Sequence, residues 1–339
     1  MADTARSPAA TMLTLLLVVA AAAVAEAAVP AIASQAVRHV NRWGPFLGVV
    51  VPNGFEMEPL LRSPDFSPAK ELPYLDVAGE KKVIIVMTGL GMLNSGVTTQ
   101  LLLTLFDVEG IVHFGIAGNA DPNLHIGDVT IPRYWAHTGL WNWQRYGAGP
   151  ENELALESNG DYTRKYGALN FSDYTVLAAG EKSGNLLNSV WYQPEEVFPT
   201  NGTPESRRHA FWVPVDDRYY RLSKNLESIT LERCVNATTC LARRPAVARV
   251  ERGCSASAFV DNAAYRGFLR SRLGVTAIDM ETAAVALVAA QQGAPFIAVR
   301  SLSDLAGGGS AESNEAGVFA ALAARNAVAV AVEFIKLLG

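Results

Sequence analysis

Residues 276–304 read TAIDMETAAVALVAAQQGAPFIAVRSLSD, and this stretch decides the fold class. It opens with a short apolar run at 276–279. Residues 280–292 then form an almost wholly apolar segment of helical length, which stops at Gly293. The apolar run at 294–301 is typical of a strand buried on both faces. A strand, a helix and a second strand in this order predict an α/β unit with a parallel sheet.

The same alternation continues on both sides of this unit. The sequence predicts strands at 46–51, 82–87, 110–114 and 128–132, and helices at 94–106, 264–273 and 312–338. Residues 136–249 show poor periodicity and are richer in Asn, Tyr, Trp and charge, and we interpret them as insertions on the same domain, with regular structure returning near Ser255. We therefore expect one α/β domain over residues 40–339, with a largely parallel sheet covered by helices on both faces and diverged insertions at about 136–250.

The composition excludes several classes of protein. The 339 residues are 50% hydrophobic and 18% charged, which is too apolar for a disordered chain. The net charge of −5 provides no general basic surface for nucleic acid. The chain has three cysteines and neither a Cys-x-x-Cys nor a His-x-x-x-His pair. We therefore expect neither a disulfide-dense scaffold nor a structural metal site.

The N-terminus has the features of a secretory signal peptide over residues 1–28. Arg6 precedes an apolar segment at 12–25, MLTLLLVVAAAAVA, whose last three residues fit a small-x-small cleavage pattern. The alternative is an uncleaved anchor, but the segment is short for a membrane span. We expect an exported protein without a stable membrane anchor after cleavage, located in the extracellular space or the vacuole.

An exported protein can be glycosylated and can form disulfides, so its sequons and cysteines are candidate modification sites. Three Asn-x-Ser/Thr sequons begin at Asn170, Asn201 and Asn236 and are candidate glycosylation sites. Cys234 and Cys240 bracket the third sequon and are candidates for a disulfide that closes a small surface loop, which leaves Cys254 free or buried. The alternative is three unpaired thiols.

Polar residues follow four of the predicted strands, at the sheet edge where ligands bind in such folds. Glu56 is suited to activate a water as a general base, or it is an ordinary acid in the first turn of a helix. The glycines of Thr88-Gly89-Leu90-Gly91 let backbone N–H groups approach a ligand, or they form a tight packing turn. Their spacing does not fit a dinucleotide-binding motif, and we expect no cofactor.

The other two strand ends carry charges in apolar surroundings. Residues 279–281, Asp-Met-Glu, open the apolar helix, where a carboxylate needs a partner. The two hydroxyl groups of a ribose would suit Glu281. Asp304 is suited to hold or deliver a proton, and the alternative is an Asx turn before three glycines. Arg300 is expected to pair with Glu281 or with Glu56, as part of a site or as a structural ion pair.

Three segments together resemble the nucleoside phosphorylase and nucleosidase superfamily. They are TGLGMLNSGVTTQLLL at 88–103, HFGIAGNADPNLHIGDVTIP at 113–132, and the stretch at 257–304 that begins SAFVDN and ends PFIAVRSLSD. The match runs from about Phe46 to Gly339, and its middle diverges. The secretory leader and FVDNAAYR at 259–266 resemble the plant bark-storage and vegetative-storage branch. Among characterised enzymes, the chain resembles the bacterial methylthioadenosine/S-adenosylhomocysteine nucleosidases.

The resemblance implies a fold, an assembly and a location. The fold is the superfamily's phosphorylase/hydrolase-like arrangement, a single three-layer domain with a mixed, largely parallel central sheet. Relatives imply a homo-oligomer, a dimer or higher, and a small-molecule nucleoside as the substrate with water or phosphate as its co-substrate. For an exported plant protein, the location is the apoplast or the vacuole.

The resemblance also implies roles on the base side of the substrate. Asp304 would protonate N7 of a purine, which makes the base a better leaving group. Phe259 would stack on the base, and the backbone of Val260 would recognise its edge. The implied substrate-binding set also includes Gly89, Gly118 and Ser303.

On the sugar side, the resemblance implies that Met280 and Glu281 contact the ribose, with Glu281 taking its hydroxyls. Glu56 would hold the attacking water, and Arg300 would fix Glu281 or the nucleophile. Thr88 takes the place of a ribose-side serine or threonine. The transition state would be oxocarbenium-like, so charged groups around the sugar would stabilise it.

Two departures from the superfamily's phosphorylases favour water over phosphate as the nucleophile. Those enzymes place an arginine just before the glycine motif of the third strand, where this chain has His113, and another near the first strand, where it has Glu56. A charged His113 would bind phosphate, but we expect it to be packed and neutral. Ile116 in place of a serine and Ser257 in place of an acidic residue leave the preferred substrate open.

The leading hypothesis is an exported purine nucleosidase that uses water to cleave an adenine-type nucleoside. A phosphate-dependent nucleoside phosphorylase is the second. A catalytically weak storage glycoprotein is the third, and a nucleoside- or cytokinin-binding module is the fourth. The sequence argues against storage because a protein without catalytic demand could lose any of the residues that it retains, which are Glu56, Phe259, Met280, Glu281, Arg300 and Asp304.

Overall fold

The computed structural model describes residues 31–68, 75–78, 81–143, 168–170, 189–201, 208–308 and 315–339. The chain divides into two units, residues 1–43 and residues 44–339. The described part of the first unit contains helix α2 (Ala31–Asn41). The predicted signal peptide at 1–28 lies outside the described residues.

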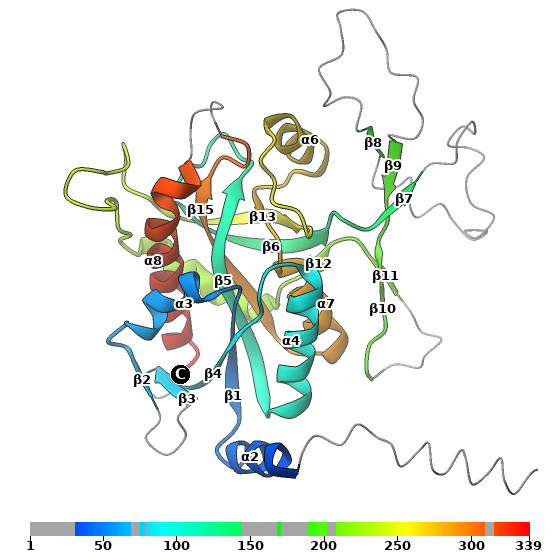
Figure 1. The fold of residues 1–339 in the computed structure, drawn as a ribbon, viewed down its shortest axis with the longest axis vertical. Coiled ribbons are helices and arrows are strands. Elements are labelled where there is room, and N and C mark those ends of the chain that lie inside the picture. Colours follow the sequence, from blue (N-terminus) through cyan, green and yellow to red (C-terminus); the bar gives the residue numbers. More distant parts are fainter. Residues whose placement is uncertain are drawn as a thin grey trace, which may run out of the picture. The chain divides into compact units, whose positions relative to one another are not determined.

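The second unit is built on a mixed sheet (Figure 1). Its ten described strands are β1 (Phe46–Val51), β2 (Phe66–Pro68), β3 (Leu75–Ala78), β4 (Lys81–Met87), β5 (Val108–Asn119), β6 (Val129–His137), β12 (Val213–Pro214), β13 (Val247–Ser255), β14 (Ala277–Asp279) and β15 (Phe296–Asp304). β4, β1, β5 and β15 lie side by side and run parallel. β13 is parallel to β6 and β14, whereas β14 runs antiparallel to β5 and β6 runs antiparallel to β15.

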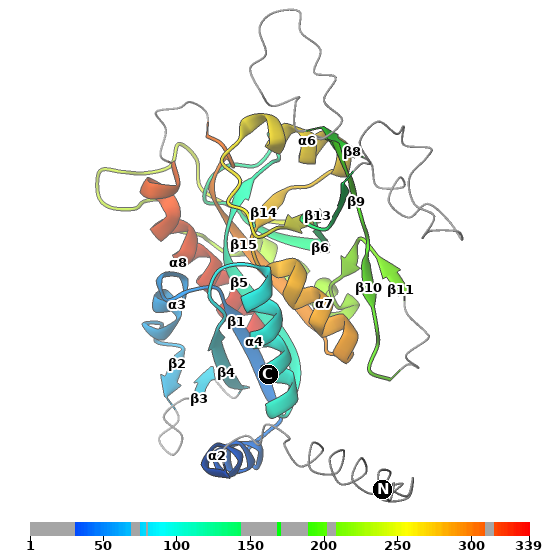
Figure 2. The same cartoon turned by 45° about the vertical axis from the view of Figure 1, so that its right-hand side comes forward.

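Helices cover both faces of this sheet, which confirms the predicted three-layer α/β fold. α3 (Gly54–Leu61) packs with α8 (Glu315–Lys336) on one face, and α4 (Met92–Leu105) packs with α7 (Thr282–Gln292) on the other (Figure 2). The short helix α5 (Asp217–Leu222) precedes a 3₁₀ turn, and α6 (Ala263–Leu273) lies near the end of β15 (Figure 1).

The core explains the apolar character of the C-terminal segments. Every residue of β15 is buried, as the run at 294–301 predicts. The segment Ala316–Lys336 is long and apolar enough to cross a membrane, but 61% of its most apolar window is buried inside the domain. That burial is typical of a core helix, because Leu322, Ala327 and Phe334 are fully buried against the sheet.

One central strand was not predicted from the sequence, and another strand ends at a different residue than predicted. β13, VARVERGCS, lies between β6 and β14, although its three charged residues and Gly253 hide the apolar run expected of a buried strand. β5 does not end at Phe114 but continues to Asn119, because the glycine motif at 115–119 stays paired with β15 and β14. The remaining middle region adds two small sheets, one of β7 (Trp141–Trp143), β8 (Ala168–Asn170) and β9 (Ser189–Tyr192) and one of β10 (Glu195–Val197) and β11 (Arg208–Ala210).

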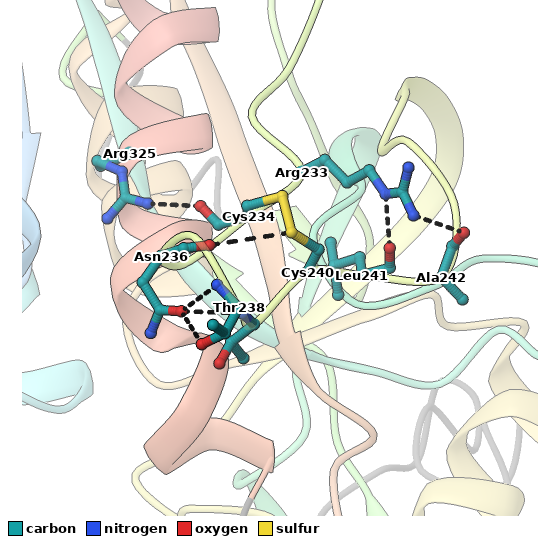
Figure 3. Close-up of a disulfide and its surroundings, with 9 residues drawn as sticks. Arg233, Cys234, Asn236, Thr238, Cys240, Leu241, Ala242 and Arg325 are labelled. Carbon is teal, nitrogen blue, oxygen red and sulfur yellow. Dashed lines mark hydrogen bonds between the residues drawn. A yellow bond between two sulfur atoms is a disulfide. The ribbon is translucent and has the colours of Figure 1, made fainter.

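A disulfide joins Cys234 to Cys240, the pair expected from the sequence, and closes a small surface loop (Figure 3). The loop is tied to helix α8 because Arg325 Nη2 donates to the Cys234 carbonyl at 3.3 Å. Cys254 is a buried thiol. Burial raises its pKa to about 12, so the thiol stays protonated and unreactive.

The sequon at Asn236 lies inside this loop (Figure 3). Asn236 is exposed, and its Oδ1 accepts hydrogen bonds from the N–H and the hydroxyl of Thr238, both at 3.0 Å. Asn201 is exposed in a turn. The sequon residues 171–172 and 202–203 lie outside the described residues, as does the side chain of Asn170.

Candidate active site

A cavity of about 400 Å³ lies at the edge where the parallel strands β1, β5 and β15 end. Its lining brings together most of the residues that the sequence singled out, from segments far apart in the chain. The lining residues with chemical or recognition potential are Asn53, Glu56, Ile116, Gly118, Phe259, Val260, Asp279, Met280, Glu281, Ser303 and Asp304.

Glu56 occupies the third position of helix α3. Asn53 caps this helix: its Oδ1 accepts from the Glu56 N–H at 3.1 Å, and its Nδ2 donates to Glu56 Oε1 at 3.0 Å. The Ile116 N–H donates to Glu56 Oε2 at 3.3 Å. The Glu56 residue is only 4% exposed, and its burial raises the pKa from 4.5 to about 7, against the lowering effect of Arg300. Glu56 is thus both an acid in the first turn of a helix and a carboxyl group suited to accept a proton near neutral pH.

Arg300 is fully buried and organises the charges behind the cavity. Its Nε lies 2.6 Å from Asp279 Oδ2 and donates to the Thr282 hydroxyl at 3.0 Å. Its Nη1 lies 3.9 Å from Glu56 Oε2, and its Nη2 lies 4.0 Å from Glu281 Oε2. Arg300 was expected to pair with Glu281 or with Glu56. In the structure the carboxylate closest to the Arg300 guanidinium is that of Asp279.

Glu281 precedes helix α7 and faces the first turn of α4. Its Oε1 accepts the Gly91 N–H at 2.9 Å, which the positive φ of Gly91 (92°) makes possible. Burial, followed by the neighbouring Asp279 carboxylate, raises the pKa of Glu281. Asp279 also accepts the N–H groups of Glu281 and Thr282, both at 3.2 Å, so the two carboxylates are held in a fixed arrangement.

His113 lies beneath Arg300 and is fully buried. Its Nδ1 lies 2.8 Å from the Val50 carbonyl, and its Nε2 contacts Arg300 Nη2. Because a carbonyl accepts only and a guanidinium donates only, Nδ1 carries the proton and Nε2 is the acceptor. Burial lowers the pKa of His113 well below its ordinary value, so the imidazole is neutral and is not a phosphate ligand.

Gly115 allows Glu56 and Arg300 to approach each other. A Cβ at this position would lie 2.0 Å from Arg300 Nη1 and 2.2 Å from Glu56 Oε2. The first glycine of the β5 motif is therefore required by the close approach of these two side chains.

At the other end of the cavity, Asp304 is the last residue of β15 and is 8% exposed. Its Oδ2 accepts from the Ser303 hydroxyl and its Oδ1 accepts from the Ala306 N–H, both at 2.7 Å. The second bond is the Asx-type turn considered from the sequence, so Asp304 has both the local role and a place in the cavity. A Cβ at Gly118 would lie 3.2 Å from Asp304 Oδ1, so this glycine also makes room for the carboxyl group.

Phe259, Val260 and Met280 supply the apolar wall of the cavity. Phe259 is 67% exposed and lines the cavity, so its ring is accessible to a ligand. Thr88 and Gly89 do not line the cavity: the Thr88 hydroxyl donates to the Gly89 carbonyl at 2.7 Å, and Leu90 faces the cavity instead. Their predicted substrate contact has no support in this geometry.

Sequence reasoning missed three residues of the site. Asn53 was detectable, because Asn followed three residues later by Glu is a helix-start signal. Asp279 was noticed only as a neighbour of Glu281, and nothing local shows that it pairs with Arg300 across the sheet. Thr282, which links the two, resembles any other residue in the first turn of a helix. Among the described residues, no group of three or more His, Cys, Asp or Glu side chains is arranged to hold a metal ion.

The comparisons with known proteins agree with this architecture. The family model described as the phosphorylase superfamily matches residues 46–336, and the chain belongs to that superfamily. Bark storage protein A of Populus deltoides is 28% identical over 301 residues, which cover 86% of this chain and 88% of that protein. The 5′-methylthioadenosine/S-adenosylhomocysteine nucleosidase of Marinomonas sp. is 40% identical over 57 residues, 17% of this chain and 25% of that protein.

Solved structures share the fold. The 5′-methylthioadenosine/S-adenosylhomocysteine nucleosidase of Helicobacter pylori aligns with a TM-score of 0.54 at 18% identity and covers 86% of this chain and 97% of its own. The futalosine hydrolase of Helicobacter pylori aligns with a TM-score of 0.53 at 19% identity, over 89% and 98%.

Proposed function

We propose that this protein is a purine nucleosidase, which hydrolyses the N-glycosidic bond of an adenine-type nucleoside. The observation that carries the proposal is the presence of Glu56 and Asp304 in one cavity, one carboxyl group suited to accept a proton and the other placed to donate one. The nucleosidase relatives support this class of reaction.

In the proposed mechanism, Asp304 protonates N7 of the base, and Phe259 and the Val260 backbone hold the base. Glu56 takes a proton from the attacking water, and Arg300 keeps its carboxylate in place. Glu281 binds the ribose hydroxyls beside Met280. As the glycosidic bond breaks, positive charge develops on the sugar, and the buried carboxylates stabilise it.

The charges of the cavity favour water over phosphate. Four carboxylates line it and, within the described lining, no lysine or arginine does. Arg300 lies behind the lining and already has Asp279, Thr282 and His113 as partners. A phosphate dianion would meet net repulsion there, so phosphorolysis is the weaker alternative.

A storage role is the second candidate, and the relatives favour it. Two bark storage proteins of Populus deltoides match 86% of this chain at 28% identity. A storage protein needs neither the buried charges behind the cavity nor the exposed Phe259, and their presence supports catalysis.

We also propose that the protein is exported, glycosylated and located in the apoplast or the vacuole. The Cys234–Cys240 disulfide supports passage through an oxidising compartment, and the exposed Asn236 is accessible to a glycan.

Self-association is a further part of the proposal. Leu93, Val97 and Leu101, spaced four residues apart on α4, are 78%, 52% and 52% exposed, so they form an apolar stripe that a second copy can cover. Light scattering of the purified protein should give at least a dimer, and Leu93→Glu should shift it toward a monomer. A monomeric wild type would contradict this part.

The test of the enzyme proposal uses the mature protein and a panel of purine nucleosides, with and without phosphate. Free sugar released without phosphate supports a nucleosidase. Sugar 1-phosphate, formed only with phosphate, would establish the phosphorylase. No release of base by a folded sample would leave storage or nucleoside binding as the function.

A further inference from the structure

We propose that Arg266 is a positioning residue, which fixes the turn after Asp304 against helix α6 and thereby aims the Asp304 carboxyl group at the substrate base. The inference rests on the proposed role of Asp304. Arg266 itself does not line the cavity, so it acts through Asp304.

The turn needs external support because its backbone is unusual. Ala306 has a φ of 49°, in the left-handed region that non-glycine residues rarely adopt, and Gly307 has a φ of 120°. The Ala306 conformation is strained and persists only where the surroundings hold it, whereas glycine adopts a positive φ freely. The Ala306 N–H that donates to Asp304 belongs to this turn, so the orientation of the carboxyl group depends on it.

Arg266 provides that support. Its Nη1 donates to the Leu305 carbonyl and, at 3.3 Å, to the Gly308 carbonyl, so the two bonds lie on either side of Ala306 and Gly307. A second contact reinforces it: a Cβ at Gly307 would lie only 2.4 Å from the Ala263 N, so the turn touches the first residues of α6 directly.

The hydrogen bonds from Arg266 to the Leu305 and Gly308 carbonyls, which we call the clamp, connect the turn after Asp304 to the groups proposed to recognise the base. Helix α6 begins after the segment with Phe259 and Val260, and Asn262 caps it by accepting the Tyr265 N–H at 2.8 Å. Val260 packs against the same apolar cluster that contains Ala306. The stacking residue, the backbone that reads the base edge and the proton donor therefore depend on one helix.

The first test is hydrogen exchange of the Arg266→Ala protein, with Arg272→Ala as the matched control, since Arg272 is an exposed arginine on the same helix. We expect the amides of residues 304–308 to exchange at least about tenfold faster in Arg266→Ala and at the wild-type rate in Arg272→Ala. Unchanged exchange in Arg266→Ala would overturn the clamp, whether or not the protein is an enzyme. If Arg266→Ala does not fold, Arg266→Met, which keeps the length of the side chain but has no hydrogen-bond donor, replaces it.

The second test separates positioning from general support. Arg266→Ala should lower kcat for base release by about 10- to 100-fold, and Arg266→Lys should recover most of it. In the Asp304→Asn protein, Arg266→Ala should lower kcat by less than about twofold, because the carboxyl group that Arg266 positions is already lost. Equal losses in both backgrounds would overturn the inference. If the wild type releases no base, the proposed function fails and the exchange test still decides the clamp.

Discussion

The two ends of the cavity are built in different ways. At the end where the nucleophile is proposed to bind, Glu56, Asp279, Glu281 and Arg300 come from three separate segments, and each is at most 6% exposed. At the end where the base is proposed to bind, Asp304 is held by its own turn, and the neighbouring Phe259 is 67% exposed.

This difference predicts which substitutions reduce the stability of the protein and which reduce only its activity. Charges buried together depend on each other, and removing one leaves the rest without compensation. A carboxyl group held by its own turn can be changed without disturbing the core. Substitutions at the nucleophile end should therefore affect folding and catalysis together, whereas substitutions at the base end should affect catalysis alone.

The largest expected effect is that of Arg300→Met. The change leaves Asp279, Glu56 and Glu281 without their shared cation, so we expect the free energy of unfolding to fall by about 3–5 kcal/mol in urea titrations. The control is Arg62→Met, which removes an exposed pair with Glu58 and should cost less than about 1 kcal/mol. Similar losses of unfolding free energy in both variants would show that the buried charges around Arg300 contribute no more to stability than an exposed ion pair.

Asp304→Asn should break catalysis and spare stability. Loss of the proton donor should lower kcat by about 10²- to 10⁴-fold, while nucleoside binding, measured by calorimetry, persists. The urea midpoint should stay near that of the wild type. A large loss of stability would mean that the base end is as interdependent as the nucleophile end.

Gly115→Ala tests the close approach at the nucleophile end. Its Cβ would overlap both Arg300 and Glu56, so we expect a loss of activity of about 100-fold. Gly267→Ala in helix α6 is the matched control, since its added Cβ would meet nothing within 4 Å apart from its chain neighbours and its own helix backbone, and it should stabilise the protein by about 0.5–1 kcal/mol. Full activity in Gly115→Ala would contradict the described contact.

The smallest effect concerns the pH dependence of stability. The pKa of Glu56 is raised from 4.5 to about 7, so the folded protein keeps a proton that the unfolded chain loses. The contribution of Glu56 to stability is therefore present below pH 4.5 and is lost as the pH rises through 7. Relative to Glu56→Gln, the wild type should lose on the order of 1–3 kcal/mol across this window. A difference that does not change with pH would contradict the burial of an ionisable Glu56.

The same contrast explains what the sequence could predict. Strand ends followed by polar residues were sufficient to find Glu56, Glu281 and Asp304, because β1 and β15 are apolar and well delimited. The pairing of Arg300 with Asp279 joins β15 to the end of β14, and no local pattern encodes it. β13 was missed because its charged residues obscure the pattern of a central strand, and Thr88 was assigned to the cavity although its hydroxyl group bonds to the adjacent carbonyl.

The most direct test of the account is the pH dependence of kcat/KM for adenine release without phosphate, in the wild type and in Glu56→Gln. We predict that the wild-type value rises as the pH increases through an apparent pKa of about 7, because Glu56 must be ionised to accept the proton of water. We also predict that Glu56→Gln loses at least about 100-fold at the pH where the wild type is most active. A pH-independent rate between 5 and 8 that Glu56→Gln retains would contradict the central claim.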